Sequence, residues 1–180
     1  MSPRPIDPSI RSRGGDEPEG PGVPVDRFKE ALSHWTSGVS LVSVRDTDGK
    51  VYATTVSSFD GLSADPPRIL FSLGPGAQVL PFLQLGGEFV VNMLEVSQRR
   101  LAVIYADPFP VGPSPFPEEG APVLPGSHAA VVCRTDRIVS VGASRVVIGL
   151  VTDAIVEGSG KPLLHYRREY WKPTPLNDPD

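Results

Sequence analysis

The sequence predicts a mainly β fold, a closed or nearly closed barrel of six to seven strands with a few helices covering its openings. Two observations favour it. Short runs rich in β-branched residues follow one another between Gly38 and Tyr166, and few helical patterns separate them. Closing such a series of strands into a barrel removes the exposed edges that an open sheet would leave.

The composition indicates one domain that binds neither nucleic acid nor membranes. The chain has 180 residues, enough for one well-packed core. Its formal net charge of −4 and its pI of 5.4 give it no electrostatic attraction for polyanions. The N-terminus has no apolar signal-peptide core, and no run reaches about 18 apolar residues. The single Cys133 excludes a disulfide framework, so we expect a cytoplasmic protein.

Three regions are expected along the chain. Residues 1–24 are rich in Pro, Gly and charge and offer little apolar surface, which predicts a disordered arm. The folded domain is expected over 25–173, and 174–180 would be a C-terminal tail. The domain would open with an amphipathic helix capped by Asp26, because apolar residues recur at helical spacing from Phe28 to Trp35.

Turn signals and apolar spacing place the next elements. The Asp-Gly turn in DTDGK predicts a hairpin between residues 39–44 and 51–58, and Asp65-Pro66-Pro67 predicts a turn before the third strand. Helices are expected over 77–85 and, capped by Ser97, in SQRRLAVIYA. The Pro/Gly-rich segment 107–126 is too long for an ordinary loop, so it is expected to be functional or disordered.

Several familiar kinds of site find little support. Gly74-x-Gly76 resembles a dinucleotide fingerprint, but Val79 stands at the third glycine position and no alternation of strands and helices follows. A glycine turn before a helix could still hold a phosphate. The three histidines lack ligand spacing, so no metal site is predicted. Ser114 lacks the flanking glycines of a hydrolase nucleophile.

The stretch TTVSSFDGLSADPP is the most unusual feature of the sequence. It places five hydroxyl side chains within ten residues at the end of an apolar strand, together with Phe59 and Leu62. Hydroxyl-rich segments usually form turns or linkers, but linkers do not carry large apolar residues. A ligand with several polar groups would explain the pattern.

In this stretch and in five others the sequence resembles the short-chain flavin reductase family, whose members supply reduced flavin to two-component monooxygenases. The other segments are HWTSGVSLVSV, FVVNMLEVSQRRLA, GAPVLPGSHAAVVC, VGASRVVIGLV and PLLHYRREY, and their order is specific. The resemblance implies an FMN-binding split β-barrel of Greek-key type. It also implies FAD or FMN as cofactor, NADH or NADPH as co-substrate, a monooxygenase partner and a homodimer.

The resemblance also implies which residues hold the flavin. Short hydroxyls and backbone amides would pair the polar groups of the ring, each of which costs about 1–3 kcal/mol when buried unpaired. Ser57 stands where relatives more often have Asn, and Arg100 is an alternative to Arg99 for phosphate charge. The implied cofactor-binding residues are Thr55, Val56, Ser57, Ser58, Ser63, Ser72, Leu73, Gly74, Asn92, Gln98, Arg99, Ser144 and Tyr166.

One position departs from the family pattern. Relatives commonly have Gly-Asp-His where this chain has Gly142-Ala143-Ser144, and the histidine lies near the nicotinamide. Ser144 is therefore the residue expected at the nicotinamide site, and no catalytic residue is assigned with it. The alternative function is a non-catalytic flavin-binding or carrier protein on the same barrel, which the missing histidine would suit.

Overall fold

The computed structural model describes residues 22–176 and divides into two compact units, one ending at Leu32 and one starting at Ser33. Most of the predicted arm, and the last four residues of the predicted tail, lie outside the described residues. The first unit contains most of helix α1 (Val25–Ser33), whose apolar residues recur at helical spacing as predicted. Asp26 is not its N-cap but lies in its first turn, where a carboxylate favours the helix dipole.

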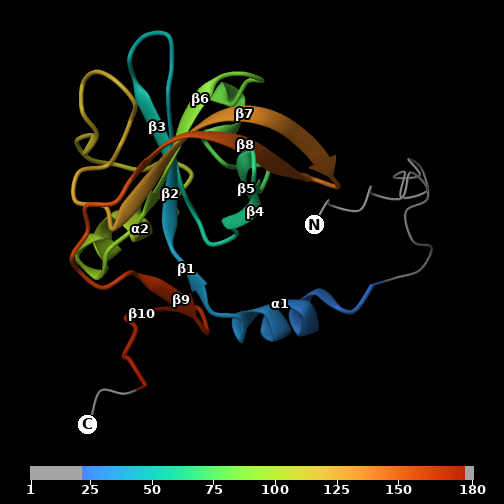
Figure 1. The fold of residues 1–180 in the computed structure, drawn as a ribbon. Coiled ribbons are helices and arrows are strands. Elements are labelled where there is room, and N and C mark those ends of the chain that lie inside the picture. Colours follow the sequence, from blue (N-terminus) through green and yellow to red (C-terminus); the bar gives the residue numbers. More distant parts are fainter. Residues whose placement is uncertain (1–21, 177–180) are drawn as a thin grey trace, which may run out of the picture. The chain divides into compact units, whose positions relative to one another are not determined.

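A seven-stranded antiparallel sheet forms the second unit and confirms the mainly β prediction (Figure 1). Its hydrogen-bonded order is β3-β2-β6-β7-β8-β5-β4. Consecutive strands pair in β2–β3, β4–β5, β6–β7 and β7–β8, whereas β2–β6 and β5–β8 join segments distant in sequence. The long β7–β8 hairpin curves across this sheet (Figure 1). The strands are β2 (Ser40–Arg45), β3 (Val51–Val56), β4 (Asp60–Ala64), β5 (Pro67–Leu73), β6 (Glu88–Met93), β7 (Ala129–Val141) and β8 (Ser144–Ile155).

The predicted hairpin is confirmed, and β4 is an addition that the sequence did not indicate. Strands β2 and β3 pair from Ser40 opposite Val56 to Arg45 opposite Val51, across a turn in which Gly49 has a φ of 83°. The Asp65-Pro66 turn leads into β5 as expected, but it does so from β4, a strand with every residue exposed. Short β4 has no apolar alternation, which is the signal for a half-buried strand.

A second, three-stranded sheet has the order β1-β9-β10. It consists of β1 (Ser37–Gly38), β9 (Leu164–Tyr166) and β10 (Glu169–Trp171). Arg167 and Arg168 form the turn between β9 and β10 with φ values of 49° and 65°, a conformation that glycine or asparagine usually adopts. Because arginines occupy these positions, no residue pattern typical of a hairpin turn precedes β10.

The two helices predicted within the barrel domain are shorter than expected. Instead of a helix over 77–85 there is a single 3-10 turn, η1 (Leu80–Phe82), because Pro81 has no amide hydrogen and Gly86 follows closely. Helix α2 (Arg99–Ile104) is confirmed, preceded by the 3-10 turn η2 (Val96–Gln98). Ser97 lies inside η2 and is not the cap; Glu95 and Gln98 form a capping box instead.

The core has two main parts on opposite faces of the sheet. In one, Phe71 and Phe89 pack edge to face with ring centroids 5.5 Å apart. In the other, Leu41 packs with Phe116 and Leu124 of the long loop and with Ala102 of α2. Successive residues Leu41 and Val42 belong to different parts, as the two-residue period of a strand requires. Because both faces of the sheet are buried, the strands that line the site are held in position.

None of the helices in residues 22–176 is both long enough and apolar enough to cross a membrane.

Candidate functional site

A cavity of about 480 Å³ brings two of the predicted segments together, and we call it the Ser/Thr pocket. Residues 55–58, at the end of β3, face residues 72–74, at the end of β5. All seven residues of these two segments were predicted as ligand contacts. The full lining is Thr54, Thr55, Val56, Ser57, Ser58, Ser72, Leu73, Gly74, Gly76, Ala77, Ala106, Asp107 and Pro108.

Two hydrogen bonds between serines hold the β3 and β5 sides together. The Ser58 Oγ–H donates to the Ser72 carbonyl oxygen at 3.0 Å, and the Ser72 N–H donates to Ser58 Oγ at 2.9 Å. Strands β3 and β5 are not neighbours in the hydrogen-bonded order, so this exchange replaces a ladder contact at the pocket. Ser58 is therefore satisfied within the protein and shapes the pocket.

The third wall of the pocket is the segment that follows α2. The Thr55 N–H donates to the Tyr105 carbonyl oxygen at 2.9 Å, and Thr55 Oγ1 donates to the Ala102 carbonyl oxygen at 2.8 Å. Asp107 then accepts the Phe109 N–H at 2.7 Å, which fixes the start of the long loop. Through these two hydrogen bonds, Thr55 holds the end of β3 against α2 and the residue that follows it.

The remaining hydroxyls of the pocket are available to a ligand. Within the described chain, the side chains of Thr54, Ser57 and Ser72 make no hydrogen bond. A Cβ atom added at Gly74 or Gly76 would meet nothing within 4 Å, so the backbone of this turn is open. Short hydroxyls beside open backbone can pair the polar edge of a planar ligand or the oxygens of a phosphate. This donor set fits a flavin nucleotide.

Two predicted residues are used inside the protein and do not line the pocket. Asn92 is fully buried, donates to the Leu41 carbonyl and to Ser43 Oγ, and accepts the Leu124 N–H at 2.7 Å. Gln98 accepts the Glu95 N–H at 3.1 Å and donates to the Pro125 carbonyl at 3.1 Å. Buried amides need such partners, and here they attach the long loop to the sheet.

Two further predicted residues pack on the smaller sheet. The Arg99 guanidinium lies over the Tyr170 ring, 5.6 Å from its centroid, and does not line the pocket. Tyr166 packs edge to face with Trp171, with ring centroids 5.9 Å apart, and lies outside the pocket as well. Arg100, the alternative to Arg99, faces a second cavity described below.

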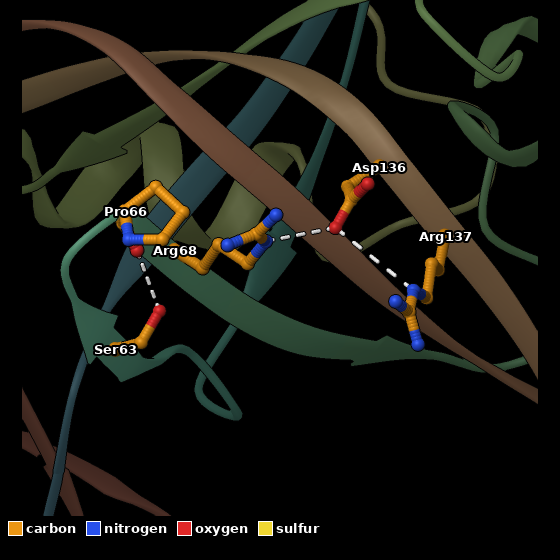
Figure 2. A network of polar contacts seen from close by, with 5 residues as sticks. All are labelled: Ser63, Pro66, Arg68, Asp136 and Arg137. Carbon is orange, nitrogen blue, oxygen red and sulfur yellow. Dashed lines mark hydrogen bonds and ion pairs between the residues drawn. The ribbon is translucent and has the colours of Figure 1, made fainter. Parts of the chain in front are cut away.

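Ser63 closes the turn that leads into β5 (Figure 2). Its Oγ–H donates to the Pro66 carbonyl oxygen at 2.6 Å, and it does not line the pocket. Beyond the turn, Arg68 of β5 pairs with Asp136 of β7 at 2.8 Å, across the intervening β8 (Figure 2). Asp136 lies at a bulge where the β7–β8 register shifts, which frees its side chain for this contact.

Ser144 begins β8 at the tip of the β7–β8 hairpin. It pairs with Val141 across the two-residue turn Gly142-Ala143. The next residue, Arg145, is opposite Leu73, the last residue of β5 and a member of the pocket lining. Ser144 is not itself in the lining, but the register places it one residue beyond the β5 end of the Ser/Thr pocket.

A second cavity of about 1180 Å³ lies along the long loop, and we call it the loop cavity. Its walls come from the start of β3, from α2 and from the loop residues Phe109 to Glu118. The sequence did not identify it as a site, although the length of the loop indicated a functional segment. Tyr105 lines the loop cavity and is followed by Ala106 of the Ser/Thr pocket, and burial raises the pKa of the Tyr105 hydroxyl.

Other reactive groups are not gathered at these cavities. Cys133 is fully buried, and burial raises the pKa of its thiol to about 12, so it is not a nucleophile. In the part of the chain that the structure describes, no cluster of three or more His, Cys, Asp or Glu side chains could hold a metal.

Comparison with known proteins gives one consistent family. Residues 32–173 match the family described as flavin reductase like domain. An NADH:riboflavin 5'-phosphate oxidoreductase of Streptomyces pristinaespiralis is 31% identical over 168 residues, which cover 90% of this chain and 96% of the relative.

Solved structures of flavin reductases also resemble this chain. The styrene monooxygenase flavin reductase of Pseudomonas putida S12 has a TM-score of 0.76 and 27% identity, covering 83% of this chain and 99% of its own. The NADH:FAD oxidoreductase of Streptomyces globisporus C-1027, solved with NAD and FAD fragments, has a TM-score of 0.73 and 25% identity, covering 85% of this chain and 94% of its own.

Proposed function

Because this chain belongs to the flavin reductase like family, we propose that it is an NADH-dependent flavin reductase that supplies reduced flavin to a partner monooxygenase. The observation that supports this most directly is the Ser/Thr pocket, where residues 55–58 meet residues 72–74. Two of the named relatives are NADH:riboflavin 5'-phosphate and NADH:FAD oxidoreductases, and the third is the flavin reductase of a styrene monooxygenase.

The chain's own residues bind and orient the reactants. When bound, flavin supplies the ring nitrogen N5, which accepts a hydride from the nicotinamide. The hydroxyls of Thr54, Ser57 and Ser72 would pair its polar groups, and the open backbone at Gly74 and Gly76 would receive its phosphate. Because the two cofactors supply the chemistry, the protein needs no acid–base pair and acts through positioning.

We further propose that the nicotinamide binds beside Ser144. The support is its place at the start of β8, one residue before Arg145 and therefore next to the β5 end of the pocket. A serine hydroxyl can hydrogen-bond the carboxamide of the nicotinamide, although it cannot stack on the ring as a histidine would.

A homodimer is part of the proposal. Every residue of the edge strand β4 is exposed, and so are the apolar side chains of Leu62 on that strand and of Val139 and Val141 at the hairpin tip. An exposed edge strand with apolar neighbours is suited to pairing with a second copy. Sedimentation velocity of the full chain tests this: a single species at the monomer mass at micromolar concentrations would rule it out.

The deciding experiment for the function is NADH consumption under air with FMN, with FAD and without flavin. We expect oxidation of NADH that depends on added flavin. Tight flavin binding without NADH turnover would instead identify the alternative, a carrier on the same barrel. Binding of neither flavin would contradict both functions.

A further inference from the structure

The Ser/Thr pocket and the loop cavity adjoin in three separate parts of the chain. On β3, Ala53 lines the loop cavity and Thr54 the pocket. In the turn after β5, Ala77 lines the pocket and Gln78 the loop cavity. After α2 the lining passes from Pro108 to Phe109. In three parts of the chain the lining passes from one cavity to the other between neighbouring residues, so the two cavities adjoin.

The turn between Gly74 and Ala77 decides which end of a flavin would approach the loop cavity. This turn has open backbone at Gly74 and Gly76, which suits a phosphate, and it runs directly into Gln78 of the loop cavity. Ser57 and Ser58 line the pocket where the chain leaves β3 for β4. A flavin with its ring at the serines and its phosphate at the turn directs any group beyond that phosphate into the loop cavity.

The loop cavity has the chemistry for such a group. Arg100 and Lys50 bring two cations, and in residues 22–176 neither forms an ion pair with a carboxylate. Phe109, which also lines this cavity, leaves 80% of its surface exposed, which is unusual for a large apolar ring. Cations beside an uncovered aromatic ring suit a phosphate joined to a planar base.

The wall that presents Phe109 is anchored. The Arg45 guanidinium donates four hydrogen bonds to carbonyl oxygens, three of them from residues 117, 118 and 120 of the loop, at 2.6 to 3.0 Å. Phe116 is buried and packs edge to face on Tyr105, with ring centroids 6.0 Å apart. Arg45 is thus committed to the loop. Lys50 lies over the Tyr52 ring, with its Nζ 4.8 Å from the ring centroid, and keeps its charge at the cavity wall. Arg100 and Lys50 are therefore the cations that a ligand could meet.

We propose that the loop cavity holds the adenylate half of FAD, so that this chain binds FAD in preference to FMN. The inference rests on the proposed function, since it requires the flavin to occupy the Ser/Thr pocket. Arg100 and Lys50 pair the second phosphate, and Phe109 stacks on the adenine. At about 1180 Å³ the cavity is large enough, since pockets of about 300–1,000 Å³ hold ligands of this size.

The test is the dissociation constant of each flavin, measured by quenching of flavin fluorescence and checked by calorimetry. We expect FAD to bind at least about tenfold more tightly than FMN. Phe109→Ala and Arg100→Gln should each weaken FAD binding about fivefold and leave FMN binding unchanged, because FMN does not reach the loop cavity. Both side chains are exposed, so the variants should keep the fold, which circular dichroism verifies.

Matched controls are Leu85→Ala and Arg137→Gln, which remove an exposed apolar and an exposed cationic side chain outside both cavities. Neither should change the affinity for either flavin. If the chain binds FMN and FAD equally, and the cavity variants change neither affinity, the inference fails while the proposed function stands. Binding of neither flavin would overturn the proposed function itself.

One further outcome would show that the loop cavity binds the adenylate of NADH and not that of FAD. NADH also carries one, so the Michaelis constant for NADH is measured with FMN as the flavin. If Phe109→Ala and Arg100→Gln raise that constant and leave the affinity for FAD unchanged, the loop cavity serves the nicotinamide nucleotide and the assignment to FAD is wrong. We expect no change in that constant.

Discussion

Ser58 and Ser72 exchange two hydrogen bonds, with the Ser58 hydroxyl donating to the Ser72 carbonyl and accepting the Ser72 N–H. The contact joins the ends of β3 and β5, which no backbone ladder connects. A hydroxyl in a ligand-binding stretch is therefore used to set the width of the pocket. Flavin binding then depends on Ser58 through the position of its neighbours.

Ser58→Ala should weaken flavin binding about fivefold or more. The change removes both hydrogen bonds and frees Ser72 from the β3 side, and losses of this kind cost about 1 kcal/mol. Fluorescence titration with flavin measures it. Ser63→Ala is the matched control, because its hydroxyl closes a turn outside the pocket. Unchanged affinity in folded Ser58→Ala protein would show that the contact does not shape the site.

The sequence predicted those features that depend on local chemistry. Strand periodicity gave the sheet, and the Asp-Gly turn gave the hairpin ending at Val51. The hydroxyl cluster led, through the family resemblance, to the two segments that meet in the Ser/Thr pocket. The sheet and the hairpin could be predicted because a strand's alternation and a turn's residues occupy consecutive positions. Flavin binding by the two segments stays a prediction.

The features that could not be predicted from the sequence depend on contacts between distant segments. Asn92 matches the family pattern, yet whether its amide faces a ligand or the loop depends on Leu124, 32 residues away. Arg99 and Arg100 are neighbours of one type, and only the position of Tyr170 assigns Arg99 to the smaller sheet. The loop cavity has no local signature, because its walls come from four segments separated in sequence: residues 45–53, Gln78, residues 100–105 and residues 109–118.

Asn92→Ala should destabilise the protein by about 3 kcal/mol. The side chain is fully buried, and its loss leaves the Leu124 N–H and Ser43 without their partners. Urea unfolding measures the free energy. Gln84→Ala, which removes an exposed amide, should change stability by less than about 0.5 kcal/mol. A comparable loss in both variants would contradict the buried network.

Gly149→Ala should destabilise the protein by about 2 kcal/mol or more, because the core has no space for a methyl group there. An added Cβ would lie 2.4 Å from Phe89 Cζ and 3.1 Å from Cys133 Cβ, and both neighbours are fully buried. Gly38→Ala is the control, since its Cβ would meet nothing within 4 Å. Thermal unfolding compares the two. Equal melting temperatures would show that Phe89 moves aside without cost.

Cys133 should make the protein less stable as the pH rises from about 9 to 12. Burial raises the thiol pKa from 9.0 to about 12, so the unfolded chain loses this proton first. Burial also raises the pKa of Tyr105 and Tyr170, which adds to the same trend. In Cys133→Ala the free energy of unfolding should fall less steeply over this range. Identical slopes would contradict the assignment to the thiol.

The same burial should make Cys133 unreactive in the native state. At pH 8 a disulfide reagent such as dithionitrobenzoate should release no chromophore until the protein is unfolded in guanidinium chloride. Rapid reaction of the native protein, at a rate like that of a free thiol, would show that the β7–β8 region opens readily.

Ser144→His should lower the Michaelis constant for NADH and leave kcat unchanged at saturating flavin. An imidazole at the start of β8 could stack on the nicotinamide, and interactions made equally in the ground and transition states change only the Michaelis constant. Steady-state kinetics at several NADH concentrations measure this. Ser140→His is the matched control, because Ser140 lies in β7 of the same hairpin and pairs with Arg145. If Ser144→His and Ser144→Ala both match the parent in kcat and in the Michaelis constant, the nicotinamide does not bind beside Ser144.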